Sequence, residues 1–229
     1  MLVTRPRFDA ERTAEKLAVL GYEALLDPVI EIEPLPFAAD ASGVSALVFT
    51  SANAARVAGM QNALKHSPVF AVGERTAEVA REAGFEIAGV AVGDVNTLGK
   101  LIVAKLSTGQ KVLHLAGEDR AGDLPGYLSR NGITSEVGIV YRARASEALR
   151  PETVSAFRSN GVEGVLHYSE RSAAIFVRLA EKAGLRDLAG AARHYCVSAA
   201  AASPLASLDV QAEVAASPSE AALLDLLKR

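Results

Sequence analysis

Short apolar runs alternate with longer amphipathic segments along the whole chain. Residues 2–4, 47–50 and 69–72 are hydrophobic runs without polar alternation, which is typical of strands buried on both faces of a sheet. The segments between such runs carry apolar positions at helical spacing, and Asp9 is expected to cap the first helix. The alternation predicts an α/β fold whose parallel strands are covered by helices on both faces.

Four of the helical segments end in the same way, with glycine followed by a hydrophobic residue. The pairs are Gly21-Tyr22, Gly84-Phe85, Gly132-Ile133 and Gly184-Leu185. Glycine accepts the left-handed conformation that a Schellman stop requires, and the following hydrophobe packs back on the last turn. The recurrence indicates one supersecondary unit used several times.

Longer stretches also repeat. Residues 47–54 parallel residues 165–172 at an offset of 118 (165 − 47), and residues 69–73 parallel residues 194–198 at an offset of 125 (194 − 69). Residues 2–21 parallel residues 113–132 at an offset of 111 (113 − 2). The chain therefore reads as two copies of one α/β module.

The order of these offsets predicts a nested layout. One domain is expected to use residues 1–35 plus 145–229, and residues 36–144 form a second domain inserted between them. Extended segments near 29–36 and 138–145 fall where the chain must cross twice, so they are expected to form a two-stranded antiparallel connector.

Composition limits the kinds of partner. The 24 basic and 27 acidic residues give a formal net charge of −3, so no global field attracts nucleic acid or an anionic membrane, and an anionic ligand must be held by local groups. The single cysteine, Cys196, sits in an apolar run and is expected to be a buried hydrophobe. The N-terminal residues lack a signal-peptide pattern and no apolar run approaches the roughly 20 residues of a membrane span, so a cytoplasmic location is expected. A monomer is expected because no long exposed apolar pattern demands a partner.

Several familiar motifs are absent. The sequence has no G-x-G-x-x-G after a strand, no H-E-x-x-H, no C-x-x-C and no G-x-S-x-G. Residues 93–101 resemble a phosphate-binding loop but have five residues between the glycines and leucine in place of the metal-binding hydroxyl. The histidines at 66, 114, 167 and 194 lack metal-ligand spacing, so structural or surface roles are expected for them.

Polar groups gather instead where the strands are expected to end, which is where open α/β sheets bind ligands. Free N–H groups at helix starts carry partial positive charge, so several such starts can hold carboxylates without a basic stripe. The serines at these positions would also cap their helices in any such fold. The candidate binding residues are Thr4, Arg5, Ser51, Ala52, Asn53, Gly73, Glu74, Arg75, Thr76, Ser169, Glu170, Arg171, Ser172 and Ser198.

At these residues the chain resembles the uroporphyrinogen-III synthase family. The matching stretches are Leu2-Val3-Thr4-Arg5-Pro6, Phe49-Thr50-Ser51-Ala52-Asn53-Ala54, Ala71-Val72-Gly73-Glu74-Arg75-Thr76-Ala77, Val140-Tyr141-Arg142 and Tyr168-Ser169-Glu170-Arg171-Ser172-Ala173. The resemblance implies two flavodoxin-like domains with parallel sheets, joined by a two-stranded antiparallel connector, the first domain being built from both chain ends.

The resemblance also implies an activity. The family converts hydroxymethylbilane, a linear tetrapyrrole with eight carboxylates, into uroporphyrinogen III, losing water and inverting ring D, on the route to haem, chlorophyll and cobalamin. The terminal hydroxyl leaves to give an azafulvene, the substituted carbon of the last pyrrole attacks it, and the resulting spiro intermediate fragments and recloses. No metal or organic cofactor is implied, and hydroxymethylbilane synthase is the expected source of the substrate.

Residue roles follow from the same resemblance. Tyr141 matches the family's cleft tyrosine and is expected to donate a proton or hydrogen bond to the departing hydroxyl, although it could simply pack the connector. Thr76 matches a family threonine, and Ser51, Ser169 and Ser172 match substrate-side positions. Family members often carry adjacent threonines after the strand at 195–197, whereas this chain has Ser198 followed by four alanines, so only Ser198 or backbone amides are expected to act there.

A second reading of the fold is a non-catalytic protein. A hinged pair of α/β domains can close on a small anion as a sensor or carrier, because such modules host many functions. The two readings differ in whether a bound tetrapyrrole is converted.

Overall fold

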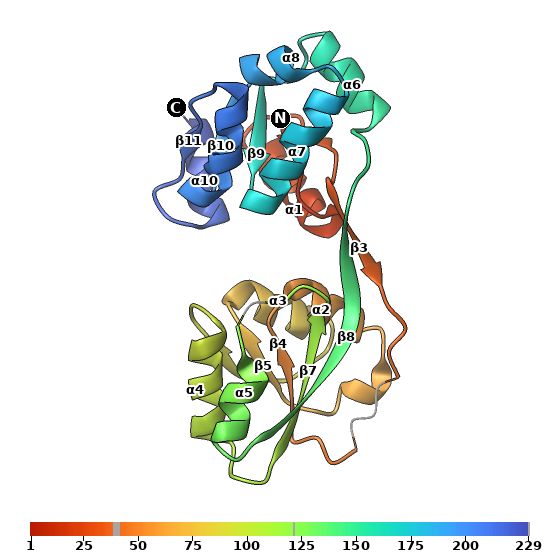
Figure 1. Ribbon diagram of the computed structural model, residues 1–229, viewed down its shortest axis with the longest axis vertical. Coiled ribbons are helices and arrows are strands. Elements are labelled where there is room, and N and C mark those ends of the chain that lie inside the picture. The colour runs from red at the N-terminus through yellow and green to blue at the C-terminus, as the bar shows by residue number, and fades with distance from the viewer. Residues whose placement is uncertain (39–41, 121, 229) are drawn as a thin grey trace. The chain divides into compact units, whose positions relative to one another are not determined.

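The chain forms two compact α/β units in the computed structural model, which describes residues 1–38, 42–120 and 122–228 (Figure 1). Unit 1 comprises Met1–Glu31 and Arg144–Arg229, and unit 2 comprises Ile32–Ala143. Within the described residues, no helix combines the length and apolar character needed to cross a membrane.

Unit 1 is built on a five-stranded parallel sheet with the order β11-β10-β9-β1-β2. Its strands are β1 (Leu2–Val3), β2 (Leu25–Leu26), β9 (Gly164–His167), β10 (Arg193–Cys196) and β11 (Glu213–Val214). Its helices are α1 (Arg7–Val19), α6 (Pro151–Arg158), α7 (Glu170–Lys182), α8 (Arg186–Ala191), α9 (Ala199–Ala202) and α10 (Glu220–Asp225), with 3-10 turns η2 (Ser203–Leu208) and η3 (Leu226–Lys228).

Unit 2 is built on a six-stranded sheet with the order β3-β8-β7-β4-β5-β6. Its strands are β3 (Ile30–Pro34), β4 (Ala46–Phe49), β5 (Val69–Val72), β6 (Ile87–Ala91), β7 (Lys111–Gly117) and β8 (Thr134–Ala145). Its helices are α2 (Ala52–Ala58), α3 (Glu74–Glu82), α4 (Val95–Lys105) and α5 (Leu124–Arg130), with the 3-10 turn η1 (Asn62–Leu64).

The expected connector strands are β3 and β8, which carry the chain between the units (Figure 1). They run antiparallel, because the N–H of Leu35 donates to Val140 O and the N–H of Ser146 donates to Val29 O, each over 2.9 Å. The connector also joins the sheet of unit 2: β8 begins at Thr134 and first pairs in parallel with β7. That sheet is consequently mixed rather than wholly parallel.

The two units share one strand order, circularly permuted. Reading β11-β10-β9-β1-β2 beside β6-β5-β4-β7-β8 aligns β9 with β4, β10 with β5 and β1 with β7. These are the strand pairs that the sequence repeats matched, and the order is that of flavodoxin. The predicted α/β fold of two flavodoxin-like modules is confirmed.

The predicted glycine stops are confirmed at all four positions. Gly21, Gly84, Gly132 and Gly184 have φ between 67° and 88°. At the first stop, the N–H of Tyr22 donates to Leu17 O and the N–H of Gly21 to Ala18 O, and the other three repeat this pair of bonds. A fifth stop, at the end of α6, uses Asn160 (φ 55°) instead of glycine.

The start of α1 differs from the prediction. The helix begins at Arg7, and the residue at the N-cap position is Pro6, whose O accepts from the N–H groups of Asp9 and Ala10. Asp9 lies one turn inside, so its expected capping role is wrong. Proline presets its own φ for this start, and the acidic side chain contributes to the first turn instead.

The sheet of unit 2 is buried on both faces, as its uninterrupted apolar strands require. Leu47, Phe49, Leu113 and Leu115 pack with residues of α2 and α3. Ala46, Val48 and Val112 point the other way and pack with residues of α4 and α5. In unit 1, Val3 and Leu166 pack with α1 and α10. Along the regular parts of these strands, successive residues thus face opposite sides of the sheet with a period of two.

Candidate active site

Each sheet has a point where the chain reverses its direction of winding. In unit 2 this point lies between β4 and β7, because α2 follows β4 on one face of the sheet and α5 follows β7 on the other. In unit 1 it lies between β1 and β9, whose following helices are α1 and α7. Open α/β sheets bind ligands beside the carboxyl ends of such strands. The segments concerned begin with Thr50 and Glu118 in unit 2 and with Thr4 and Tyr168 in unit 1.

Tyr141 reaches the switch point of unit 2 through an irregularity in β8. Ala116 pairs with Ile139 but Gly117 pairs with Tyr141, so the register shifts by one residue. As a result Val140 and Tyr141 both pack on the α2 and α3 side of the sheet. A bulge re-aims a side chain in this way, and without it Tyr141 would face α4 and α5.

Glycine at 117 makes room for the tyrosine ring. A Cβ atom at this position would lie 2.6 Å from Cζ and 2.9 Å from the hydroxyl oxygen of Tyr141. Real Cβ atoms do not approach this closely, so with any other residue at 117 the ring of Tyr141 would have to move from its place beside β7.

The hydroxyl of Tyr141 donates a hydrogen bond of 3.0 Å to Oγ of Ser51. Ser51 occupies the N-cap position of α2 in extended conformation, and its Oγ accepts from the N–H of Asn53 over 3.1 Å. Ala52 is the first residue of α2, and the side chain of Asn53 is held by Arg56 over 2.9 Å. The structure therefore brings together the predicted residues Tyr141, Ser51, Ala52 and Asn53.

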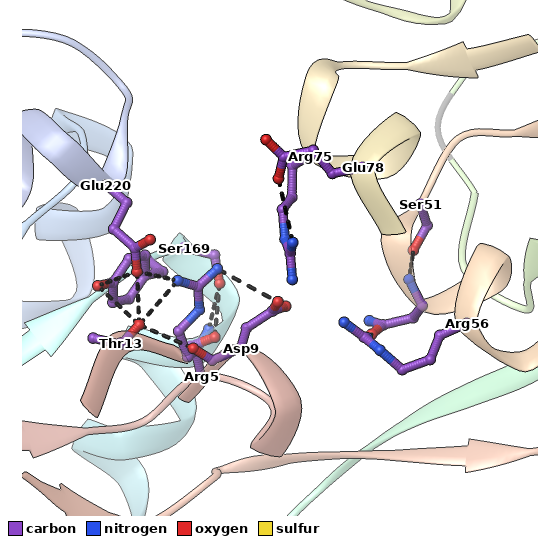
Figure 2. Close-up of polar contacts among 12 residues, drawn as sticks. Arg5, Asp9, Thr13, Ser51, Arg56, Arg75, Glu78, Ser169 and Glu220 are labelled. Atoms are coloured by element: carbon purple, nitrogen blue, oxygen red, sulfur yellow. Dashed lines mark hydrogen bonds and ion pairs between the residues drawn. The ribbon is translucent and has the colours of Figure 1, made fainter. Parts of the chain in front are cut away.

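The predicted residues Gly73 to Thr76 form the start of α3. Gly73 has φ 75° and ψ 146°, a backbone conformation that favours glycine, and its N–H donates to Ala91 O over 2.8 Å. Glu74 pairs with Arg81 over 2.6 Å. Arg75 pairs with Glu78 over 3.4 Å (Figure 2). Thr76 is a buried residue in the first turn of α3.

In unit 1, Thr4 and Arg5 follow β1. Thr4 is fully buried and its hydroxyl donates to Leu166 O over 3.2 Å, which ties β1 to β9. Arg5 lies over the ring of Tyr168, 3.9 Å from its centroid. Its guanidinium donates to Oε1 of Glu220 over 2.8 Å, and Figure 2 shows the side chain directed toward Glu220. The charge of Arg5 is thus engaged by a carboxylate of its own unit.

The three remaining groups of candidates lie at starts of helices in unit 1. Oγ of Ser169 accepts from the N–H of Ser172 over 3.1 Å and lies 2.8 Å from Oγ of Ser172. Glu170 and Arg171 are exposed in the first turn of α7. Ser198 caps α9, accepting from the N–H of Ala201 over 3.2 Å. Ser169 and Ser198 thus fill the capping role expected of them in any such fold.

The sequence did not reveal the network around Glu220. Besides Arg5, the carboxylate accepts from Thr13 over 2.7 Å and Tyr168 over 3.1 Å, and it also pairs with Lys16. Burial raises the pKa of Glu220, but the hydrogen bonds from Lys16 and Thr13 and the charge of Arg5 outweigh it, so the pKa is lowered overall. Burial, reinforced by the charge of Glu220, raises the pKa of Tyr168. These partners lie more than 50 residues from Glu220, so no local pattern signals them.

The four histidines take structural or surface positions. His66 is exposed, whereas His114, His167 and His194 are buried. Nε2 of His167 lies 2.9 Å from Nδ1 of His194, whose own Nε2 lies 2.9 Å from Ala189 O. Because a carbonyl only accepts, Nε2 of His194 carries a proton. Burial lowers the pKa of both histidines, which favours neutral rings in which Nε2 of His167 donates to Nδ1 of His194. Among the residues that the structure describes, no cluster of three or more His, Cys, Asp or Glu side chains could hold a metal ion.

Fold and site together define a class: an α/β protein of two circularly permuted flavodoxin-like units, with hydroxyls and helix starts at the switch point of each sheet. The family model described as "Uroporphyrinogen-III synthase HemD" matches residues 11–225. The chain therefore belongs to the uroporphyrinogen-III synthase family, cyclising lyases of tetrapyrrole biosynthesis. This confirms the family and the enzymatic reading, and nothing favours the non-catalytic alternative.

Solved structures agree with the fold. The uroporphyrinogen-III synthetase of Helicobacter pylori superposes with a TM-score of 0.62 at 22% identity, covering 90% of this chain and 92% of that one. A mutant uroporphyrinogen III synthase of Thermus thermophilus gives a TM-score of 0.53 at 18% identity, covering 100% and 97%. A search of curated proteins found no match.

Proposed function

We propose that this chain converts hydroxymethylbilane into uroporphyrinogen III with Tyr141 as the proton donor. The phenol would give its proton to the terminal hydroxyl of the substrate as the C–O bond breaks, releasing water and leaving the azafulvene. The proton lost when the final pyrrole regains aromaticity would return to the phenolate, so the net products are the ring and one water. The contact that supports this role is the 3.0 Å bond from Tyr141 to Ser51.

Ser51 would act as a positioning residue. Its Oγ already accepts from the N–H of Asn53, so it holds the phenol hydroxyl at a fixed place beside the start of α2. To donate to the substrate, the O–H bond of Tyr141 would turn from Ser51 to the substrate hydroxyl. Placement of this kind matters because the substrate can close unaided to the uninverted isomer, so the enzyme must above all select geometry.

The carboxylates of the substrate would be held by local donors. The starts of α3 and α7, with Gly73, Glu74, Arg75, Thr76 and the segment 169–172, offer backbone N–H groups and two arginines. Thr4, Arg5 and Ser198 complete the candidate set, and Arg5 would bind substrate only by exchanging Glu220 for a substrate carboxylate. The near-neutral charge of the chain fits such local recognition.

We further propose that the protein acts as a cytoplasmic monomer and receives its substrate directly from hydroxymethylbilane synthase. The instability of the linear tetrapyrrole supports a short transit between the two enzymes. Light scattering should report the 23.9 kDa monomer mass. In a coupled assay, the type III fraction should not fall when an inert protein crowds the solution.

The deciding experiment is an isomer assay. Purified protein and freshly generated hydroxymethylbilane, without added metal or nucleotide, should yield the type III isomer, as read by chromatography of the oxidised porphyrins. Tyr141→Phe should slow turnover by about ten- to a thousandfold, the range of general acid effects. Tyr127→Phe is the matched control, since Tyr127 lies with the α4 and α5 cluster on the other face of the sheet. Formation of type I product alone would overturn the proposal.

A double-mutant cycle tests the link between the two residues. Ser51→Ala removes the acceptor and should lower turnover, but it should have little further effect in the Tyr141→Phe background if it acts through the phenol. Because the same change removes a helix cap worth about 1 kcal/mol, folding is checked by circular dichroism. Strictly additive losses would show that Ser51 acts independently of Tyr141.

A further inference from the structure

The donors around Glu220 form a carboxylate-binding position in unit 1, and Figure 2 shows Arg5 and Thr13 directed toward its carboxylate. Oε1 of Glu220 accepts from the guanidinium of Arg5 over 2.8 Å and from the hydroxyl of Tyr168 over 3.1 Å. The hydroxyl of Thr13 lies 2.7 Å from the same oxygen, and Oε2 pairs with Lys16. The lowered pKa of Glu220 keeps the side chain ionised near pH 7, so these groups already hold a carboxylate ion.

The donors of this position belong to the part of unit 1 where open α/β sheets bind ligands. Arg5 follows β1 and Tyr168 follows β9, the two strands of the switch point. Thr13 and Lys16 lie one turn apart on α1. Glu220 comes from elsewhere in the chain, because it is the first residue of α10 and lies 52 residues beyond Tyr168. The sheet and α1 therefore provide the binding position, and α10 supplies the carboxylate.

The guanidinium of Arg5 is held in place by groups other than Glu220. Its central carbon lies over the ring of Tyr168, 3.9 Å from the centroid. One amino group donates to Oγ1 of Thr13 over 3.3 Å, and the carboxylate of Asp9 lies 3.9 Å from the other. A planar guanidinium fixed in this way is preorganised to bind a carboxylate.

The charges of this cluster call for one carboxylate at the position that Glu220 occupies. Arg5 and Lys16 bring two positive charges, and Asp9 offsets one of them. Glu220 offsets the other. Removing the charge of Glu220 therefore leaves a partly buried cation that another anion can pair with.

The helix that carries Glu220 is held on the sheet by other residues. Four leucines of α10 and the turn after it are buried in the core of unit 1: Leu223, Leu224, Leu226 and Leu227. Ser219 caps the start of α10, since its Oγ accepts from the N–H of Ala222 over 3.2 Å. The side chain of Glu220 is 21% exposed and so lies where solvent reaches the network. Loss of its contacts is thus compatible with an intact α10.

We propose that Glu220 competes with a carboxylate of the substrate for this binding position, which makes it a specificity-determining residue. The inference rests on the proposed function. Competition of this kind favours a polycarboxylate over a simple anion, because carboxylates bound elsewhere raise the effective concentration of the one that displaces Glu220. A ligand attached at several points overcomes the competition, whereas a ligand with one carboxylate does not.

A small carboxylate tests the binding position without turnover. In Glu220→Ala, propionate should raise the melting temperature saturably at millimolar concentration, because it binds the donors that Glu220 leaves unpaired. Chloride at the same ionic strength should give no such rise, and neither should propionate with the wild type. Asp225→Ala is the matched control, since it removes another carboxylate of α10, one that pairs with Lys228, and it should not respond to propionate. Absence of a saturable rise in Glu220→Ala would overturn the inference, whatever the isomer assay shows.

Kinetics separate competition from a purely structural role, and they do not require Glu220→Ala to fold. Glu220→Gln keeps the shape of the side chain and should lower KM for hydroxymethylbilane by about three- to tenfold with kcat unchanged, as suits a partly exposed charge pair. In the Arg5→Gln background the same change should lower KM much less, because the guanidinium that it frees is gone.

An unchanged or raised KM in Glu220→Gln would overturn the inference and leave Glu220 with the single role of holding unit 1 together. Failure of the proposed function is recognised separately, as type I product from the wild type in the isomer assay.

Discussion

Acid should weaken unit 2 through His114. Its pKa is lowered from 6.5 to about 4 in the folded protein, so the unfolded chain binds a proton at pH values where the folded chain does not. The stabilisation is fully present above about pH 6.5 and is lost as pH falls toward 4. Since each tenfold change in proton affinity is worth about 1.4 kcal/mol, the loss amounts to about 3 kcal/mol.

The perturbation is His114→Gln, which keeps a neutral polar group beside Thr50 but does not titrate. Urea unfolding is measured between about pH 7.5 and 4.5, with hydrogen exchange of β4 and β7 peptides reporting on unit 2 separately from unit 1, where His167 and His194 lie. The free energy of unfolding should fall by about 3 kcal/mol over this range in the wild type and by much less in the variant.

His66→Gln, at an exposed position, is the control and should retain the wild-type pH dependence. If His114→Gln shows the same loss of stability with acid as the wild type, the titrating group lies elsewhere. Burial of His114 would then not be the cause of the acid sensitivity of unit 2.

Four further predictions follow from single contacts. Gly117→Ala puts a Cβ 2.6 Å from the Tyr141 ring, so it should cost about 1 to 3 kcal/mol and reduce turnover as Tyr141→Phe does; a fully active variant in the isomer assay would contradict the placement of the ring. Glu220→Gln should cost about 1 to 3 kcal/mol in urea unfolding at pH 7, reduced because Glu220 keeps 21% of its side chain exposed, and this difference should shrink as pH falls below about 4.5, where the lowered pKa no longer stabilises the fold. Cys196 is fully buried with its pKa raised to about 12, so a thiol reagent should label the native protein at least about a hundredfold more slowly than the protein in denaturant; equal rates would show that the strand is accessible. Gly184→Ala should lower stability by about 1 kcal/mol through backbone strain alone, because φ is +67° and nothing lies within 4 Å of the new Cβ; a neutral result in thermal melting would disprove the strain.

Prediction of the site from sequence succeeded unevenly, and the reason is sequence distance. Ser51, Ser169 and Ser198 were found because a capping serine is signalled by its place between a strand and a helix. The partner of Arg5 was missed because Glu220 lies 215 residues away. Asp9 was misassigned as a cap because the pattern alone did not weigh the effect of Pro6 on the helix start.

The local and repeated features of this protein can be read from the order of its amino acids. Glycine at a left-handed stop, apolar runs buried on two faces and the paired modules depend on properties of neighbouring residues, so they leave a pattern along the chain. Three features emerged only once the chain was folded: which way Tyr141 faces, which carboxylate Arg5 meets, and that one nitrogen of His114 lacks a partner among the described residues. Those outcomes depend on strand register and on groups brought together from distant parts of the chain, and neither leaves a local pattern.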